Sequence, residues 1–323
     1  MTERTLSVIG LGLIGGSLLR AAEGAGWKVR GATRSEATAT AARNAGFDVT
    51  ASIEDLAVST ADDDLVVLAV PLPSVVDVLP VLARHAPRCR LTDVVSVKQP
   101  VAAAVARHTP RVRYVGGHPM AGGSDSGWAA GSATLFTGAS WVVGSDDGAD
   151  PEVWAQVAQL ALDCGAQVVP AGAAEHDAAV ARISHLPHVL AAVLASVGAD
   201  GGPLAMALGA GSFTDGTRVA ASSPELVRAM CEGNRDALLD AVDDALGRLG
   251  AARGSLASTG ALEATLRAGH HARQTFDTAR NGAHHDTVDV DLTSPGAFAQ
   301  LRELAQQGAR VVSLHDTRCQ VRM

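Results

Sequence analysis

Aromatic residues and positive charge are both scarce in this chain of 323 residues. Only 3% of the residues are Phe, Trp or Tyr although 47% are hydrophobic, so Ala, Val and Leu must build the core. Lys and Arg number 26 against 34 Asp and Glu, and the net charge of −8 argues against a nucleic-acid partner, which would need a basic surface. The low charged fraction also argues against disorder. The length predicts roughly two domains.

Paired cysteines and long apolar runs are missing as well. The four cysteines are widely separated: Cys89, Cys164, Cys231 and Cys319. Their spacing predicts reduced thiols in a cytoplasmic protein rather than a disulfide or zinc framework. We see no run that approaches the roughly 18 apolar residues of a membrane-spanning helix, and therefore expect no membrane partner. The stretch from Arg4 to Leu19 resembles a signal peptide in its charge and apolar character, but four glycines interrupt it.

Short apolar segments alternate with helical patterns through the first half of the chain. The clearest is 64–70, a β-branched run stopped by Pro71, which is typical of a strand buried on both faces. Further strand candidates lie at residues 6–10, 29–32, 90–95, 113–116, 140–144 and 167–169. This alternation predicts an α/β fold with a Rossmann-type, doubly wound parallel sheet.

The pattern changes after about residue 173. Ala and Leu then recur at three- or four-residue spacing, and strand signals return only at 287–292. A helix at 296–307 and a strand at 310–314 would complete a small βαβ tail, and residues 270–285 are expected to form a surface connection. We therefore predict a nucleotide-binding domain at 1–172, an all-helical domain at 173–282 and a tail unit at 283–323.

A glycine-rich turn of the form GxGxxG follows the first strand and precedes a helix. Gly10 permits the tight turn, Gly12 lets a pyrophosphate approach the backbone, and Gly15 lets helix and strand pack closely. The N-terminus of the helix presents unpaired N–H groups to the phosphate. The predicted cofactor contacts are Gly10, Gly12, Leu13, Ile14 and Gly15, with Val70 at the end of the strand at 64–70.

The end of the second strand indicates which dinucleotide binds. An NAD-binding domain usually carries Asp or Glu there for the ribose hydroxyls, whereas this chain reads Thr33-Arg34-Ser35. Arg34 would attract the 2′-phosphate of NADP, and Thr33 and Ser35 could donate hydrogen bonds to it. We expect NADP as the favoured cofactor with NAD possible; the alternative is that Arg34 is a solvated surface charge.

Two chemistry-bearing residues follow strands in the first half. His118, in Gly117-His118-Pro119, is placed just past a strand end, and Ser96 follows another strand in the same way. Open parallel sheets bind ligands beyond the carboxyl ends of their strands, so both side chains are expected to face a cleft. Lys98 is interpreted as a solvated charge at a helix start rather than as a base.

The helical half contains a second group of candidates. His185 and His188 share one helix face and could be metal ligands, but no nearby Cys or carboxylate cluster completes a site, and no metal is predicted. Thr217 and Arg218 lie in a predicted polar loop with Asp215. Arg218 could pair with Asp215 or anchor a substrate carboxylate.

Five segments occur in one order along the chain: GLGLIGGS at 10–17, DVVSVK at 93–98, HPMAG at 118–122, SHLPH at 184–188 and DGTR at 215–218. Together they resemble the prephenate/arogenate dehydrogenase family of tyrosine biosynthesis, over about residues 6–249. The resemblance implies NAD(P)-dependent oxidative decarboxylation of a cyclohexadienyl substrate, which is prephenate or arogenate. It also implies a homodimer formed through the helical domain.

The resemblance also implies roles for individual residues. His118 would be the hydrogen-bond partner and base for the ring hydroxyl, and Ser96 would help to orient either group. Arg218 would bind a substrate carboxylate, with His185, His188 and Thr217 lining the pocket. Because aromatisation makes loss of the carboxylate easy, positioning and electrostatics are the protein's main tasks.

The choice between the two substrates rests on the loop after HPMAG. Asp125, if it faces the pocket, could pair with the ammonium of arogenate and repel the more anionic prephenate. Some members of the family carry Glu near the position of Ser124, so substrate preference stays open. NADP slightly favours an arogenate-using variant.

Two other functions are compatible with parts of the sequence. A β-hydroxyacid dehydrogenase would use a Lys of its helical domain, and residues 171–282 contain no Lys. A catalytically silent NADP-binding sensor or scaffold is the remaining alternative. The presence of His118, Ser96 and Arg218 together argues against such a loss of chemistry.

Overall fold

The computed structural model describes residues 4–123, 125–281 and 286–323. Contacts divide the chain into two compact units. The first comprises Met1–Asp177, Pro224–Gly233 and Thr287–Met323, and the second comprises Ala178–Ser223 and Asn234–Asp286. The first unit is therefore assembled from three separate stretches of the chain.

A six-stranded parallel sheet forms the centre of the first unit, in the order β3-β2-β1-β4-β5-β6. Its strands are β1 (Thr5–Ile9), β2 (Lys28–Ala32), β3 (Val49–Thr50), β4 (Leu65–Leu68), β5 (Arg90–Asp93) and β6 (Arg113–Tyr114). Its intervening helices are α1 (Leu13–Gly24), α2 (Glu36–Asn44), α3 (Ile53–Val58), α4 (Leu72–His85) and α5 (Gln99–His108). All four residues of β4 are buried, as the apolar run predicts. The doubly wound sheet is thus confirmed, and its strand order reverses between β1 and β4, where such sheets bind ligands.

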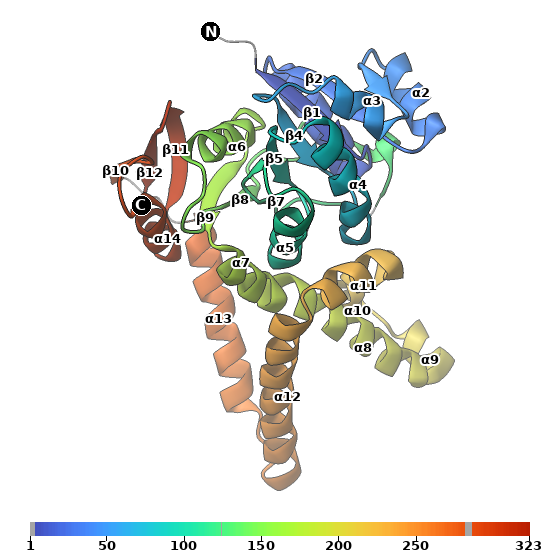
Figure 1. Ribbon diagram of the computed structural model, residues 1–323. Coiled ribbons are helices and arrows are strands. Elements are labelled where there is room, and N and C mark those ends of the chain that lie inside the picture. The colour runs from blue at the N-terminus through green and yellow to red at the C-terminus, as the bar shows by residue number, and fades with distance from the viewer. Residues whose placement is uncertain (1–3, 124, 282–285) are drawn as a thin grey trace. The chain divides into compact units, whose positions relative to one another are not determined.

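A second, mixed sheet has the order β10-β12-β11-β9-β8-β7. Its strands are β7 (Gly117–Pro119), β8 (Ser140–Gly144), β9 (Gln167–Ala171), β10 (Thr287–Asp291), β11 (Arg310–His315) and β12 (Arg318–Arg322), with α6 (Pro151–Asp163) between β8 and β9 and α14 (Ala297–Gln306) between β10 and β11. The tail strands, red in Figure 1, extend this sheet beyond β9. The tail is therefore βαββ rather than βαβ. Asp316, at φ 54°, makes a turn tight enough for a further antiparallel strand.

The core of the first unit uses most of its few aromatic residues. Trp141, Trp154 and Phe136 are its largest fully buried side chains. They belong to a cluster that also contains Leu301, Val311 and Val321 of the tail, so the tail strands share the main core. A second cluster, around β4, α4 and α5, is aliphatic as the composition predicts.

The second unit is helical. Its elements are α8 (Leu186–Asp200), α9 (Gly202–Ala207), α10 (Gly211–Thr217), α12 (Arg235–Ser258) and α13 (Glu263–Asn281), while α11 (Pro224–Gly233) belongs to the first unit. The predicted surface connection at 270–285 is wrong up to Asn281, because α13 covers that stretch. Ion pairs at i, i+4 spacing, Arg267–Glu263 and Arg273–Asp277, stabilise this exposed helix. Residues 282–285 lie outside the described residues.

One helix contradicts the expectation about apolar runs. Together α7 (Ala173–Val180), a turn of π-helix at Ala181–His185 and α8 form one helix of 28 residues, with a window of mean hydropathy 1.4 that is 22% buried. By length and composition this helix could cross a membrane, so the expectation of no such run is wrong for this segment. One such helix is weak evidence of a membrane span, because core helices of soluble proteins meet the same criteria of length and composition.

The glycine turn allows a direct test of the packing between β1 and α1. A Cβ on Gly15 would collide with the carbonyl oxygen of Gly10, whereas a Cβ on Gly12 would meet nothing within 4 Å. We expect Gly15→Ala to lower the free energy of unfolding by about 1–3 kcal/mol. Gly12→Ala, the matched control, should change it by less than about 0.5 kcal/mol. Urea denaturation measures both, and equal stability of the two variants would contradict this account of the turn.

Candidate functional site

The turn between β1 and α1 fits a dinucleotide pyrophosphate. Gly10 has φ 99°, and a Cβ there would lie 2.5 Å from the carbonyl oxygen of Ala69 and 2.8 Å from Val70 Cγ1. Gly12 is the residue before α1 and has no side chain to cap the helix. A Cβ at Gly12 would meet nothing within 4 Å. The first N–H groups of α1, beginning at Leu13, are therefore available to an anion. Val70, predicted as a further cofactor contact, lies beside Gly10.

The segment after β2 carries the predicted phosphate contacts. The Arg34 side chain is 67% exposed, with a guanidinium nitrogen 3.8 Å from an Asp77 carboxylate oxygen and another 3.2 Å from Ser74 Oγ. Such an exposed ion pair contributes little and can be exchanged for a phosphate. Ser35 Oγ accepts a hydrogen bond from Thr38 N and so caps α2. Thr33 Oγ1 accepts one from Ser35 N.

His118 lies in the middle of β7, paired with Val142 of β8, and is 9% exposed. The prediction that it stands just past a strand end is therefore wrong. The chain crosses from β6 of the first sheet into β7 of the second within two residues, too few to leave a sequence signal. Gly117 permits this crossing, since a Cβ there would lie 2.7 Å from the carbonyl oxygen of Asp93.

The sequence analysis missed two residues of α7: His176, which contacts His118, and Asp177, which contacts His176. His176 Nε2 lies 2.8 Å from His118 Nδ1, and His176 Nδ1 lies 2.8 Å from Asp177 Oδ1. Both residues are buried. No motif in the sequence marks His176 and Asp177. Their relation to His118 is not visible there, because 58 residues separate His176 from His118.

Lys98 is the second departure from expectation. It is 2% exposed, its Nζ is ion-paired with Asp93 Oδ1, and it donates to the carbonyl oxygen of Gly117 at 2.6 Å. The interpretation as a solvated charge is therefore wrong. Burial lowers the pKa of Lys98, against the opposing effect of Asp93. Tyr114 donates to Asp93 Oδ2 at 2.6 Å, and burial, with the neighbouring Asp93, raises the pKa of Tyr114 well above its ordinary value.

Ser96 lies three residues after the end of β5 and is partly exposed. Its hydroxyl makes no hydrogen bond within the described part of the chain, whereas the ring of His118 is held by His176. An orienting bond from Ser96 would therefore have to reach the substrate. That role stays a prediction.

The two histidines of SHLPH lie in the second unit. His185 is fully buried in the π-helical turn, with its Nδ1 3.2 Å from Asn234 Nδ2. Pro187 explains the wide turn, because its missing N–H cannot continue the regular helical ladder. His188 is half-buried in α8, and its buried Nδ1 has no hydrogen-bond partner among the described residues.

Thr217 and Arg218 also belong to the second unit. The predicted polar loop is wrong here, because α10 contains Asp215 and Thr217 and a 3-10 turn begins at Arg218. Thr217 Oγ1 donates to the carbonyl oxygen of Phe213 at 2.6 Å. Arg218 is exposed and forms no ion pair within residues 4–123, 125–281 and 286–323, so the structural pairing with Asp215 is not observed.

The loop after β7 does not distinguish between prephenate and arogenate as the substrate. Asp125 is exposed, and Ser124 lies outside the described residues. The pairing of Asp125 with a substrate ammonium requires a side chain that faces a pocket. The observed exposure provides no support for it.

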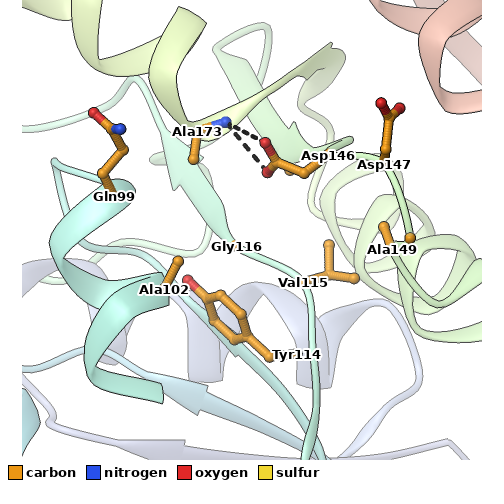
Figure 2. A pocket seen from close by; sticks show the side chains of 11 residues that line it. Gln99, Ala102, Tyr114, Val115, Gly116, Asp146, Asp147, Ala149 and Ala173 are labelled. Atoms are coloured by element: carbon orange, nitrogen blue, oxygen red, sulfur yellow. Dashed lines mark hydrogen bonds between the residues drawn. The ribbon is translucent and has the colours of Figure 1, made fainter. Parts of the chain in front are cut away.

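A separate cavity of about 410 Å³ lies beside Tyr114 and Gly116 in the first unit (Figure 2). Asp146 lines it and accepts hydrogen bonds from Ala173 N at 3.0 and 3.2 Å, and Asp147, also in its wall, pairs with Arg302 at 3.0 Å. Neither His118 nor the glycine turn lines this cavity. Its two carboxylates would repel an anionic substrate, so we exclude it as the reaction site.

Comparisons with known proteins agree with the motifs and the fold. The prephenate dehydrogenase nucleotide-binding domain matches residues 16–170, and the prephenate dehydrogenase dimerization domain matches residues 172–263. The chain is 34% identical over 252 residues to the prephenate dehydrogenase of Bacillus subtilis, covering 74% of this chain and 67% of that protein. It is 33% identical over 268 residues to the cyclohexadienyl dehydrogenase of Zymomonas mobilis, covering 78% and 88%.

Solved structures show the same relationship. A Corynebacterium glutamicum protein, provisionally named a prephenate dehydrogenase, superposes with a TM-score of 0.88 and 43% identity over 95% of this chain and 98% of that one. The arogenate dehydrogenase of Synechocystis superposes with a TM-score of 0.72 and 29% identity over 84% and 99%. Both family domains, the relatives and the shared fold lead to one assignment. The chain belongs to the prephenate dehydrogenase family of NAD(P)-dependent oxidoreductases.

Proposed function

We propose that the protein oxidatively decarboxylates prephenate to 4-hydroxyphenylpyruvate, arogenate to tyrosine, or both. The observation that carries this proposal is His118, which is almost buried and held by a hydrogen-bonded imidazole in the same unit as the glycine turn. A dehydrogenase needs this combination of a nucleotide turn and a positioned base. The matched relatives bear the names of prephenate, cyclohexadienyl and arogenate dehydrogenases. A catalytically silent sensor finds no support among them.

The reaction defines what His118 must do. A nicotinamide cofactor held by Gly12 and the first N–H groups of α1 would supply the acceptor for the hydride of the ring carbon that bears the hydroxyl. His118 accepts the hydroxyl proton as carbonyl character develops at that carbon. The ring carboxylate then leaves as carbon dioxide, and the electrons of the broken C–C bond complete the aromatic ring. No proton is released overall, so His118 returns its proton to the phenol oxygen.

We assign the substrate carboxylate to Arg218. Its guanidinium is exposed and forms no ion pair within the described residues, so it can form a bidentate pair with a carboxylate. Thr217, His185 and His188 are proposed as further substrate contacts, and Ser96 as a hydrogen-bond partner of the substrate hydroxyl. Ser124 and Asp125 stay in the proposed substrate loop without a chemical role. The preference between prephenate and arogenate is left to experiment.

The proposed cofactor is NADP, with NAD as the weaker ligand. Support comes from Arg34, whose exposed guanidinium follows β2 where NAD-binding domains usually carry a carboxylate. Residues 1–172 are proposed to bind this cofactor, in line with the family domain at 16–170.

A homodimer formed through residues 173–282 is also proposed. The matched dimerization domain spans 172–263, and α8 exposes several large apolar side chains: Leu190, Val193, Leu194 and Val197. A second copy of the chain would remove them from water. A cytoplasmic location is supported by the four cysteines, all of which are free. The residues 283–323 form the proposed tail unit, with no regulatory role assigned.

The activity itself is tested by initial rates followed through the absorbance of the reduced nicotinamide. Prephenate and arogenate are each combined with NAD and NADP. We expect turnover in at least one combination, with NADP giving the higher kcat/KM because Arg34 pairs with its phosphate. A folded protein that binds NADP yet is silent in all four combinations would contradict the dehydrogenase and favour the sensor.

The base is tested by His118→Asn, which removes the proton acceptor but keeps a polar side chain. We expect kcat to fall by about 10²–10⁴, the usual contribution of general base catalysis, while the Kd of the cofactor is unchanged. Steady-state kinetics and fluorescence titration measure the two quantities. Turnover equal to that of the unaltered protein would remove His118 from the mechanism.

The cofactor preference is tested by Arg34→Ala. Loss of the guanidinium should raise KM for NADP by about tenfold or more, because a charge-assisted pair with the 2′-phosphate is lost. KM for NAD should change by less than about twofold. Arg88→Ala removes another exposed, ion-paired arginine and serves as the control. Equal effects of Arg34→Ala on both cofactors would refute the phosphate assignment.

A further inference from the structure

A chain of hydrogen bonds leads from His118 into the interior of the first unit. His118 Nδ1 is 2.8 Å from His176 Nε2, and His176 Nδ1 is 2.8 Å from Asp177 Oδ1. His118, His176 and Asp177 are 9%, 2% and 1% exposed. Each imidazole therefore has a defined partner on its Nδ1 side, and solvent is excluded from both contacts.

Asp177 sets the direction of these bonds. Its Oδ1 accepts from Lys98 N at 2.8 Å, and its Oδ2 accepts from Gln99 N at 2.9 Å. Burial alone would raise the pKa of Asp177, but the hydrogen bonds from His176, Gln99 and Lys98 hold this pKa below its ordinary value. An ionised carboxylate can only accept hydrogen bonds. His176 Nδ1 must therefore be the donor toward Asp177.

That donor fixes the protonation of both rings. A neutral histidine with its proton on Nδ1 has its lone pair on Nε2. The Nε2 of His176 therefore accepts, and the Nδ1 of His118 donates. The lone pair of His118 is then on its Nε2. A doubly protonated His176 would instead donate from Nε2 to His118 Nδ1 and place the proton of a neutral His118 on Nε2, so the tautomer of His118 distinguishes the two arrangements.

We propose that His176 and Asp177 are positioning residues that hold His118 in its Nδ1–H tautomer, so that Nε2 takes the hydroxyl proton and returns it. This inference rests on the proposed role of His118 as the base. While His118 carries the extra proton, its Nδ1–H continues to donate to His176, and the Asp177 carboxylate at the end of the chain offsets the positive charge.

The first test is Asp177→Asn. The amide has one accepting oxygen and cannot replace both carboxylate oxygens. With its NH₂ on the side of Lys98 N and His176, it donates to His176 Nδ1, both imidazoles reverse, and His118 Nε2 carries a proton. With its NH₂ toward Gln99 N, the tautomer is kept, but the negative charge that offsets a protonated His118 is lost. We expect kcat to fall by about 100-fold or more, with the Kd of the cofactor unchanged.

A matched control separates positioning from structural support. Asp150 also holds two backbone N–H groups, those of Glu152 and Val153, at 3.0 and 3.1 Å, and bonds no histidine within the described part of the chain. Asp150→Asn should retain kcat within about twofold. A similar small loss in both variants would show that Asp177 is only a structural cap and would overturn the proposal.

The second test observes the tautomer directly and needs no turnover. Two-bond ¹H–¹⁵N correlation of the histidine-labelled, full-length protein should show His118 with its proton on Nδ1. His118→Asn assigns the signal. An Nε2–H tautomer in the unaltered protein would overturn the proposal. Full turnover by His118→Asn would instead overturn the base assignment, which is a separate failure.

Two variants of His176 keep the proposal testable if Asp177→Asn does not fold. His176→Gln presents an amide oxygen that can accept from His118 Nδ1–H, whereas His176→Leu fills the space without an acceptor. We expect the Gln variant to retain a kcat at least about tenfold above that of the Leu variant, which is the difference made by one buried acceptor. Equal turnover would overturn the proposal.

Discussion

Burial of ionised side chains around the segment 93–99 is the constraint on which the first unit depends. Asp93, fully buried, accepts from Val95 N, the ammonium of Lys98 and the hydroxyl of Tyr114. Asp177 accepts from the N–H groups of Lys98 and Gln99 at the start of α5. A buried charge is tolerated only while its donors remain in place, and loss of one donor costs several kcal/mol. The loop between β5 and α5 therefore has one stable arrangement.

This arrangement reaches the candidate base through the backbone. Lys98 donates to the carbonyl oxygen of Gly117, the residue before His118, and His176 holds the imidazole of His118 from the other side. Both supports are hydrogen bonds to buried groups. A substitution of Lys98 or His176 can therefore keep this geometry only if the new side chain has a similar shape and polarity. His118 thus lies on strand β7, which pairs with β8, and a side chain of α7 holds its ring.

Local patterns predict much of the fold and the position of the glycine turn, but not the contacts around His118. The apolar run at 64–70 and the glycine turn each depend on neighbours within a few residues, so the sequence predicts the parallel sheet and the turn between β1 and α1. The burial of Lys98 and the contact of His176 with His118 depend on partners far away in the sequence. No periodicity records such contacts. Strand β7, with three residues, is too short to show alternation, and α13 is stabilised by ion pairs on an exposed surface rather than by an apolar face.

The tail has a consequence for how the chain can be made. Strand β11 pairs with β9 through Val311 and Val168, and Cys319 and Val321 of β12 are each 1% exposed in the main core. The last strands therefore complete a sheet that begins before the helical segment is synthesised. Because a growing chain emerges from the ribosome N-terminus first, the core of the first unit cannot close until β11 and β12 have been synthesised. The helical segment is therefore synthesised while the core of the first unit is incomplete, and its exposed apolar side chains, such as Leu190 and Val197, favour aggregation at that stage.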